Sequence, residues 1–273
     1  MKKSILYLLL IAGFISQLHA GQLVVTATEF IKMNDNSSNF YPRFSPVGDY
    51  LLLTSSNYKG LRAFYFSSRK ISTITTDDGA GLNAQISADG KNILYNKVEL
   101  IRNLRRNTLM QVNVGNGISK KLSASALKPL ITIEDRKMIL FKSGTRKVLT
   151  PNGAAESYIW PVISPDGKKI AYTVVGKGTF VCNLNGSQPV ALGYLNAPRW
   201  LNNQWIIGMH DTDDGEKLLS SELIAVGVDG KGRQIIKTPA GKMALYPDAS
   251  ADGKRIAFHS EKGEIYILTI SIQ

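Results

Sequence analysis

The fold is decided by the stretch Ile163-Ser164-Pro165-Asp166-Gly167-Lys168-Lys169-Ile170-Ala171-Tyr172, in which a Pro-Asp-Gly turn joins two apolar segments. Proline presets φ for a tight reversal, and Asp-Gly supplies the position with positive φ that such a reversal needs. Residues 170–174, which follow the turn, are apolar and rich in β-branched or aromatic side chains. This composition is typical of a strand, so the stretch predicts a β-hairpin.

The same phrase recurs along the chain with gradual drift. Clear copies lie at residues 86–95 and 249–258, a shorter one at 44–51, and eroded ones at 132–141 and 200–208. The spacing from one turn to the next is 42, 46, 31, 36 and 50 residues, close to the length of a propeller blade, when the turns are placed at Gly48, Gly90, Arg136, Gly167, Asn203 and Gly253. Six turns predict an all-β protein, a six-bladed β-propeller with four-stranded blades. A β-sandwich rarely repeats one turn phrase six times, and the repeat of a β-helix is much shorter, so both are disfavoured.

The two ends of the chain predict how the ring closes. The last copy of the phrase is followed by one strong strand, at residues 264–271, so the last blade lacks an outer strand. Residues 22–28 form an apolar strand before the first copy. We expect these two strands to pair and to close the ring without a covalent link.

The first twenty residues have the composition of a secretory signal peptide. Lys2 and Lys3 precede an apolar run over residues 5–18, which ends in a small-residue site at Ala20. The run is shorter than the roughly 20 residues that a transmembrane helix needs. We therefore expect cleavage after Ala20, a single propeller domain at residues 21–273, and a periplasmic or secreted protein.

Charge and cysteine content limit the partners of the exported chain. Without Lys2 and Lys3, 31 basic residues stand against 21 acidic ones, a net charge of +10. This excess favours acidic partners, although basic side chains scattered over loops also serve solubility. Export argues against nucleic acid as the partner. The single cysteine, Cys182, cannot form an internal disulfide or a lipid anchor at the new N-terminus, and it fits a small core residue. We expect a monomer without stable membrane insertion after signal cleavage.

The Ser-Pro-Asp-Gly-Lys-Lys-Ile-Ala-Tyr phrase at residues 164–172, with Ser-Ala-Asp-Gly-Lys at 87–91 and 250–254, resembles the repeat of the TolB-like six-bladed β-propeller family. The resemblance covers nearly the whole mature chain. It implies the propeller fold and a periplasmic module that binds proteins. Related blades also occur in peptidases and polysaccharide lyases, where catalysis comes from added domains or from metal-binding histidines, so the resemblance does not by itself assign an activity.

Groups that could carry catalysis are few in the mature chain, which has only His210 and His259 as imidazoles. His210 opens an acidic segment whose oxygen atoms are of the kind that Ca²⁺ prefers, contributed by Asp211, Asp213, Asp214 and Glu216. The spacing matches a Ca²⁺ loop only in part, so a long polar hairpin is the favoured interpretation. His259 follows a strand and fits a hydrogen-bonded residue at its edge. We expect no cofactor and no metal.

The candidate binding residues precede the turn phrases, where the innermost strand of each blade borders the central channel. These segments bring aromatic and polar side chains to one face, which is typical of a recognition surface. The predicted site consists of Tyr41, Arg43, Asn83, Gln85, Trp160, Arg199, Tyr246 and Asp248. Packing between blades is an equal alternative for Tyr41, Trp160 and Tyr246.

A basic segment lies outside this set. Residues 102–106 read Arg-Asn-Leu-Arg-Arg, and with Lys120 and Lys121 they make a local basic excess on the predicted second and third blades. The segment could contact an anionic envelope surface, but a solvated hairpin loop is the simpler interpretation.

Three functions follow from these observations. The first is a non-catalytic exported module that binds an envelope or extracellular protein or peptide at the channel face. The alternative is binding of an anionic glycan or another acidic ligand at the same face, suggested by the net charge and by Arg43 and Arg199. The third is a lyase or hydrolase that uses His210 with a metal.

Overall fold

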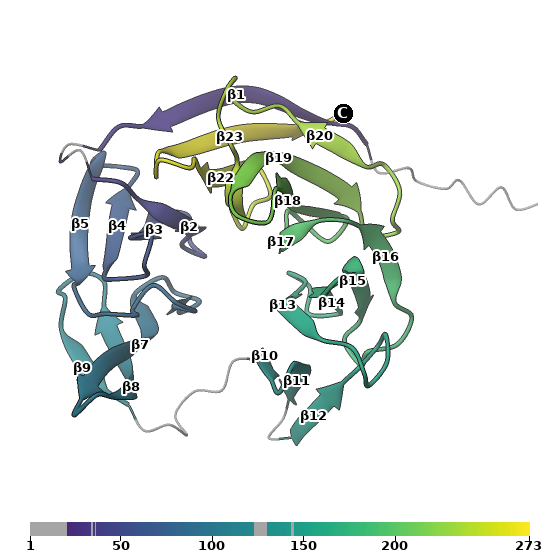
Figure 1. Ribbon diagram of the computed structural model, residues 1–273. Helices are drawn as coiled ribbons and strands as arrows, with labels where there is room; N and C mark the ends of the chain where they lie inside the picture. The colour runs from purple at the N-terminus through teal and green to yellow at the C-terminus, as the bar shows by residue number, and fades with distance from the viewer. Residues whose placement is uncertain (1–20, 34, 36, 123–129, 143–144) are drawn as a thin grey trace, which may run out of the picture.

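The computed structural model describes residues 21–33, 35, 37–122, 130–142 and 145–273, which form 23 β-strands and no helix. The strands make six antiparallel sheets that stand around a central channel as the blades of a propeller (Figure 1). The predicted all-β, six-bladed fold is therefore confirmed. No helix in the described part of the chain has the length and apolarity to span a membrane. The predicted signal peptide, residues 1–20, lies outside the described residues.

Blades 1 to 3 occupy the first half of the ring, and each runs from the channel outward in chain order. Blade 1 contains β2 (Phe40–Phe44), β3 (Tyr50–Thr54), β4 (Leu61–Tyr65) and β5 (Lys70–Thr75). Blade 2 contains β6 (Gln85–Ile86), β7 (Asn92–Ile101), β8 (Leu104–Asn113) and β9 (Ser119–Lys121). Blade 3 has three strands among the described residues, β10 (Ile131–Glu134), β11 (Lys137–Lys142) and β12 (Thr145–Leu149).

Blades 4 to 6 complete the ring, each with four strands. Blade 4 contains β13 (Tyr158–Ile163), β14 (Lys169–Val174), β15 (Gly178–Asn183) and β16 (Val190–Gly193). Blade 5 contains β17 (Asn196–Trp200), β18 (Trp205–Asp213), β19 (Leu218–Gly227) and β20 (Gln234–Ile236). Blade 6 contains β21 (Leu245–Ala249), β22 (Arg255–His259), β23 (Ile265–Ile272) and the first strand of the chain, β1 (Leu23–Ile31).

The recurring turn phrase joins the first strand of a blade to the second, and its side chains stabilise the reversal locally. In blade 4 the Ser164 hydroxyl donates to Asp166 Oδ1 at 2.6 Å and accepts from the peptide N–H of Lys169 at 2.9 Å. The same carboxylate accepts from the N–H of Lys168 at 3.1 Å, and Gly167 has φ +70°. These hydrogen bonds lie within six residues, so the turn is specified by its own short sequence.

The ring closes by pairing the two ends of the chain. β1 and β23 are antiparallel along their whole length, from Leu23 opposite Ile272 to Ile31 opposite Ile265. Leu23 and Ile31 are 6 % and 1 % exposed, because they pack into the cores on either side of blade 6. The expected closure by N- and C-terminal strands is confirmed.

The hydrophobic core is divided among the seams between neighbouring blades. Clusters of buried apolar side chains fill the seams 1/2, 3/4, 4/5, 5/6 and 6/1. Among the described residues no such cluster joins blade 2 to blade 3. Buried apolar side chains therefore fill five seams, whereas the described residues of the seam between blades 2 and 3 form no such cluster.

Candidate functional site

Blades 1, 4, 5 and 6 begin with a distorted inner strand, and blade 2 has a left-handed residue just before its inner strand. In each of these five blades one residue at this place has a left-handed backbone. In blades 1, 4, 5 and 6 the register between the first and second strands also shifts, as between Phe40 and Arg43. The residues concerned are Tyr41, Asn83, Trp160, Ala197 and Tyr246, with φ between 46° and 58°. Proline follows four of them and cannot donate to a ladder, which explains the bulge. The bulge brings the residue two positions later to the channel.

The central cavity has a volume of about 760 Å³ and collects five of the eight predicted site residues. Arg43, Asn83, Gln85, Trp160 and Arg199 line it from blades 1, 2, 4 and 5. The wall also includes side chains of β7 and β8 in blade 2 and of β10 in blade 3. The cavity thus extends from the channel into the seam that has no apolar cluster.

The charges of two arginines act on one carboxylate beside this cavity. Arg199 Nε lies 3.3 Å from Asp248 Oδ1, while Asp248 Oδ2 accepts from the peptide N–H of Phe44 at 2.8 Å. Arg43 Nη1 donates to the carbonyl of Ala84 at 3.0 Å. Burial lowers the pKa of Arg43 to about 10, and the charge of Arg199 acts in the same direction. Because a pKa of about 10 is still well above neutral pH, the guanidinium of Arg43 stays charged there. Burial raises the pKa of Asp248, whereas Arg199 and Arg43 lower it.

The predicted residues Tyr41 and Tyr246 lie apart from the cavity lining and contact each other, with ring centroids 4.8 Å apart. Tyr41 also stacks on Tyr58 at 4.5 Å, and both Tyr41 and Tyr246 contact the ring of His259. His259 lies within β22 and is 3 % exposed, so it is a core residue, in contrast to the strand-edge position expected from the sequence. The half-buried rings of Tyr41, Tyr58 and Tyr246 therefore cover the seam between blades 1 and 6.

His210 and the acidic segment after it form the hairpin between β18 and β19, as expected for a long polar hairpin. The His210 ring contacts Tyr194, with centroids 5.3 Å apart, and Asp211 Oδ1 accepts from Asn196 Nδ2 at 2.9 Å. Asp213 and Asp214 accept hydrogen bonds from backbone N–H groups of the hairpin turn. In the described part of the chain, no group of three or more His, Cys, Asp or Glu side chains is placed to hold a metal ion.

Several cavity residues were not predicted from the sequence. They come from the second and third strands of blade 2 and from the inner strand of blade 3, namely Leu94, Tyr95, Asn96, Asn107, Leu109, Ile131, Thr132 and Ile133. The unusual length of the apolar and polar run over residues 92–113 was the available signal, because it makes the blade 2 hairpin longer than those of blades 1 and 4. The four X-Pro pairs were the signal for the bulges.

No protein-family model and no curated protein matches this sequence. Among solved structures the chain is similar to TolB from Acinetobacter baumannii, with 18% identity and a TM-score of 0.55 over 77% of this chain. The match spans 56% of the length of that TolB. An oligogalacturonate lyase in complex with manganese gives 14% identity and a TM-score of 0.49, over 86% of this chain and 78% of that one. The oligogalacturonate lyase of Vibrio parahaemolyticus gives 12% and 0.46, over 92% and 98%. At such identities the likeness to TolB shows the propeller fold alone.

Proposed function

We propose that this chain is an exported, non-catalytic binding module whose central cavity holds an acidic peptide segment of an envelope or extracellular protein. The observation that carries the proposal is the imbalance of charge at the cavity, because Arg43 and Arg199 both line it, whereas the carboxylate of Asp248 lies beside it and forms an ion pair only with Arg199. A carboxylate of a ligand would supply the missing negative charge. Arginine binds carboxylates well because its guanidinium offers several donors in a fixed plane.

The remaining cavity side chains suit a peptide backbone. Asn83, Gln85, Asn96 and Asn107 carry amides, and each amide offers both donors and an acceptor, as a peptide group does. Trp160 adds a large aromatic surface of the kind that dominates binding energy at concave sites. A volume of about 760 Å³ lies within the usual range for ligand cavities and is enough for a few residues of an extended segment.

The test uses a library of octapeptides and the double variant R43Q/R199Q, which removes both charges from the cavity. We expect wild-type protein to select peptides that contain Asp or Glu, and the double variant to bind them at least tenfold more weakly. The variant K120Q/K121Q removes two charges from β9, outside the cavity, and should bind within about twofold of wild type. Melting temperatures identify any loss caused by unfolding.

Because Arg199 forms an ion pair with Asp248 and the charge of Arg43 also acts on that carboxylate, the single variants Q85A and W160A provide a second measurement. Each should weaken peptide binding while the fold is retained. Equal losses in R43Q/R199Q and K120Q/K121Q would indicate a diffuse charge effect and refute the cavity site. Binding of oligouronates in place of peptides would instead establish the alternative, an anionic glycan.

Export is part of the proposal and rests on the composition of residues 1–20. We expect cleavage after Ala20 and a periplasmic or secreted monomer. Intact mass of the exported protein measures the cleavage site directly. A full-length chain in the membrane fraction would contradict it.

A further inference from the structure

The hairpin between β7 and β8 rises beyond its blade. Ten residue pairs join these two strands, from Asn92 opposite Asn113 to Ile101 opposite Leu104, whereas β3 and β4 of blade 1 have only five residues each. Arg102 and Asn103 form the two-residue turn, with φ of 51° and 62°, which is typical of a tight hairpin. Every residue from 100 to 107 is exposed to solvent.

The tip of this hairpin is both apolar and basic. Leu100, Ile101 and Leu104 are 76 %, 45 % and 74 % exposed. Three arginines stand among them, at positions 102, 105 and 106. The side chains of these arginines make no hydrogen bond or ion pair with another described residue. With Lys97 and Glu99, residues 97–106 carry a net charge of +3.

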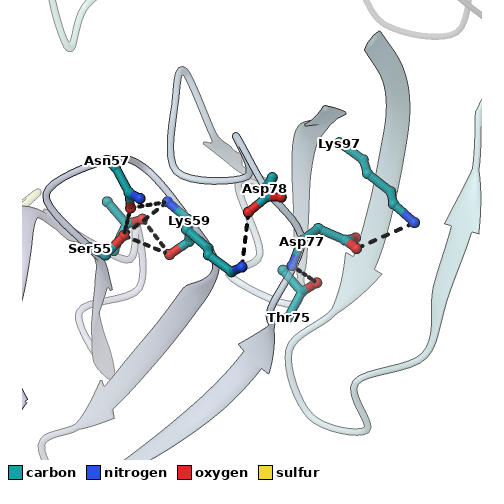
Figure 2. A network of polar contacts seen from close by, with 8 residues as sticks. Ser55, Asn57, Lys59, Thr75, Asp77, Asp78 and Lys97 are labelled. Carbon is teal, nitrogen blue, oxygen red and sulfur yellow. Dashed lines mark hydrogen bonds and ion pairs between the residues drawn. The ribbon is translucent and has the colours of Figure 1, made fainter. Parts of the chain in front are cut away.

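The base of the hairpin is held firmly to the rest of the protein. Asp77 accepts a hydrogen bond from the Tyr95 hydroxyl at 2.7 Å. Its carboxylate also lies 3.5 Å from Lys97 Nζ (Figure 2). The N–H of Val98 donates to the carbonyl of the neighbouring Asp78 at 2.8 Å. Lys59 of blade 1 lies 3.2 Å from the Asp78 carboxylate, so the anchoring network spans two blades (Figure 2). The exposed side chains are therefore presented on a fixed support.

We propose that this tip docks the protein reversibly on an anionic lipid bilayer, with Leu100, Ile101 and Leu104 entering the interface and the arginines at the headgroups. Three side chains on a convex turn cannot bury the roughly 800 Å² per partner of a stable protein interface. A bilayer interface needs no matching surface, since it accepts apolar side chains at any point and anionic lipids attract nearby cations. The chemistry of the tip therefore fits a bilayer better than a second protein.

The opposite side of the ring sets the orientation. Blade 5 stands across the channel from blade 2 (Figure 1). The β18–β19 hairpin of blade 5 and the β7–β8 hairpin of blade 2 both join the second strand of the blade to the third, so both tips lie on the same face of the ring. Residues 210–219 carry a net charge of −3. An anionic surface attracts the tip of blade 2 and repels that of blade 5. The protein should therefore dock tilted, with blade 2 nearest the lipid.

Vesicles test the proposal, with the mature chain and two lipid compositions, phosphatidylcholine alone and phosphatidylcholine with about a third phosphatidylglycerol. We expect sedimentation with the anionic vesicles only, weakened by salt. At about fivefold per arginine, R102Q/R105Q/R106Q should bind about a hundredfold more weakly. L100S/L104S should also bind more weakly. The control K91Q/K168Q/K254Q removes three charges from the turn phrases at the other end of the blades, and should bind as wild type does.

A fluorescent label reports the docking geometry, because the native Cys182 is buried and leaves an introduced cysteine as the reactive thiol. A polarity-sensitive dye on L104C should shift to the blue with anionic vesicles, and the same dye on E216C in the blade 5 hairpin should not. Equal shifts, equal binding to both vesicle types, or no binding would overturn the proposal. A dimer without lipid that R102Q/R105Q/R106Q abolishes would assign the tip to a second copy and refute it as well.

Discussion

Acid should destabilise this protein through His259, whose ring is enclosed by aromatic neighbours. Phe40, Tyr41 and Tyr246 lie with ring centroids 5.1, 5.2 and 5.7 Å from it. Nδ1 lies 2.9 Å from the carbonyl oxygen of Ser260, to which it donates in the neutral ring, and Nε2 has no hydrogen-bond partner within the described chain. A proton on Nε2 would place a charge in this apolar site, so burial lowers the pKa of His259 to about 4.

The sign and size of the effect follow from that pKa. The unfolded chain takes up a proton near the ordinary value of 6.5, whereas the folded protein does so only near 4. Between these values the unfolded state binds more protons, so the free energy of unfolding falls as the pH falls through this window. At about 1.4 kcal/mol per pKa unit, His259 lowers the free energy of unfolding by about 3 kcal/mol once the pH has fallen through the whole window. Above pH 6.5 this destabilisation vanishes.

Urea unfolding at pH 7.5, 6.5, 5.5 and 4.5, followed by tryptophan fluorescence, measures this contribution. Each protein is compared with its own value at pH 7.5, so a general loss of stability in H259F or H259Q does not affect the result. We expect wild type to lose about 2 to 3 kcal/mol more than either variant by pH 4.5. H210Q alters a partly exposed histidine and should follow wild type. Parallel curves for wild type and both His259 variants would refute the reasoning.

Three further outcomes are expected. Deletion of residues 22–31 removes β1 and exposes the edge of β23, so it should cost at least about 5 kcal/mol and promote aggregation in a thermal melt; a melting point within a few degrees of wild type would show that β1 is dispensable. Y50F removes the buried hydrogen bond from the Tyr50 hydroxyl to the carbonyl of Gly90, 2.9 Å away, and should cost about 1 kcal/mol in urea unfolding; an unchanged midpoint would contradict this. Burial raises the pKa of Cys182 to about 12, so a thiol reagent at pH 8 should modify it only as fast as the protein unfolds; rapid stoichiometric reaction of native protein would argue against burial.

The blade pattern could be read from the sequence because its signals are local. Ser164, Asp166 and Gly167 hold their turn with one another and with the backbone of the next two residues. The six turns then set the number of blades, and an unmatched strand at each end of the chain predicted the pairing of β1 with β23. The inner-strand positions of Arg43 and Arg199 followed from the same phrase.

The tertiary structure decided which of those residues meet. Tyr41 and Trp160 occupy equivalent places before a proline, yet Trp160 lines the cavity and Tyr41 packs against Tyr246 over a different seam. The cavity reaches into the seam between blades 2 and 3 because no apolar cluster of the described residues fills it, and no short stretch of sequence encodes that difference.

Local hydrogen bonding thus made the turns, the strands and the number of blades readable from the amino-acid sequence. The burial of His259 and the grouping of Arg43 and Arg199 around Asp248 depend on residues that are distant in sequence. Those features are set by how six similar blades pack around one axis, and only the folded ring determines that packing.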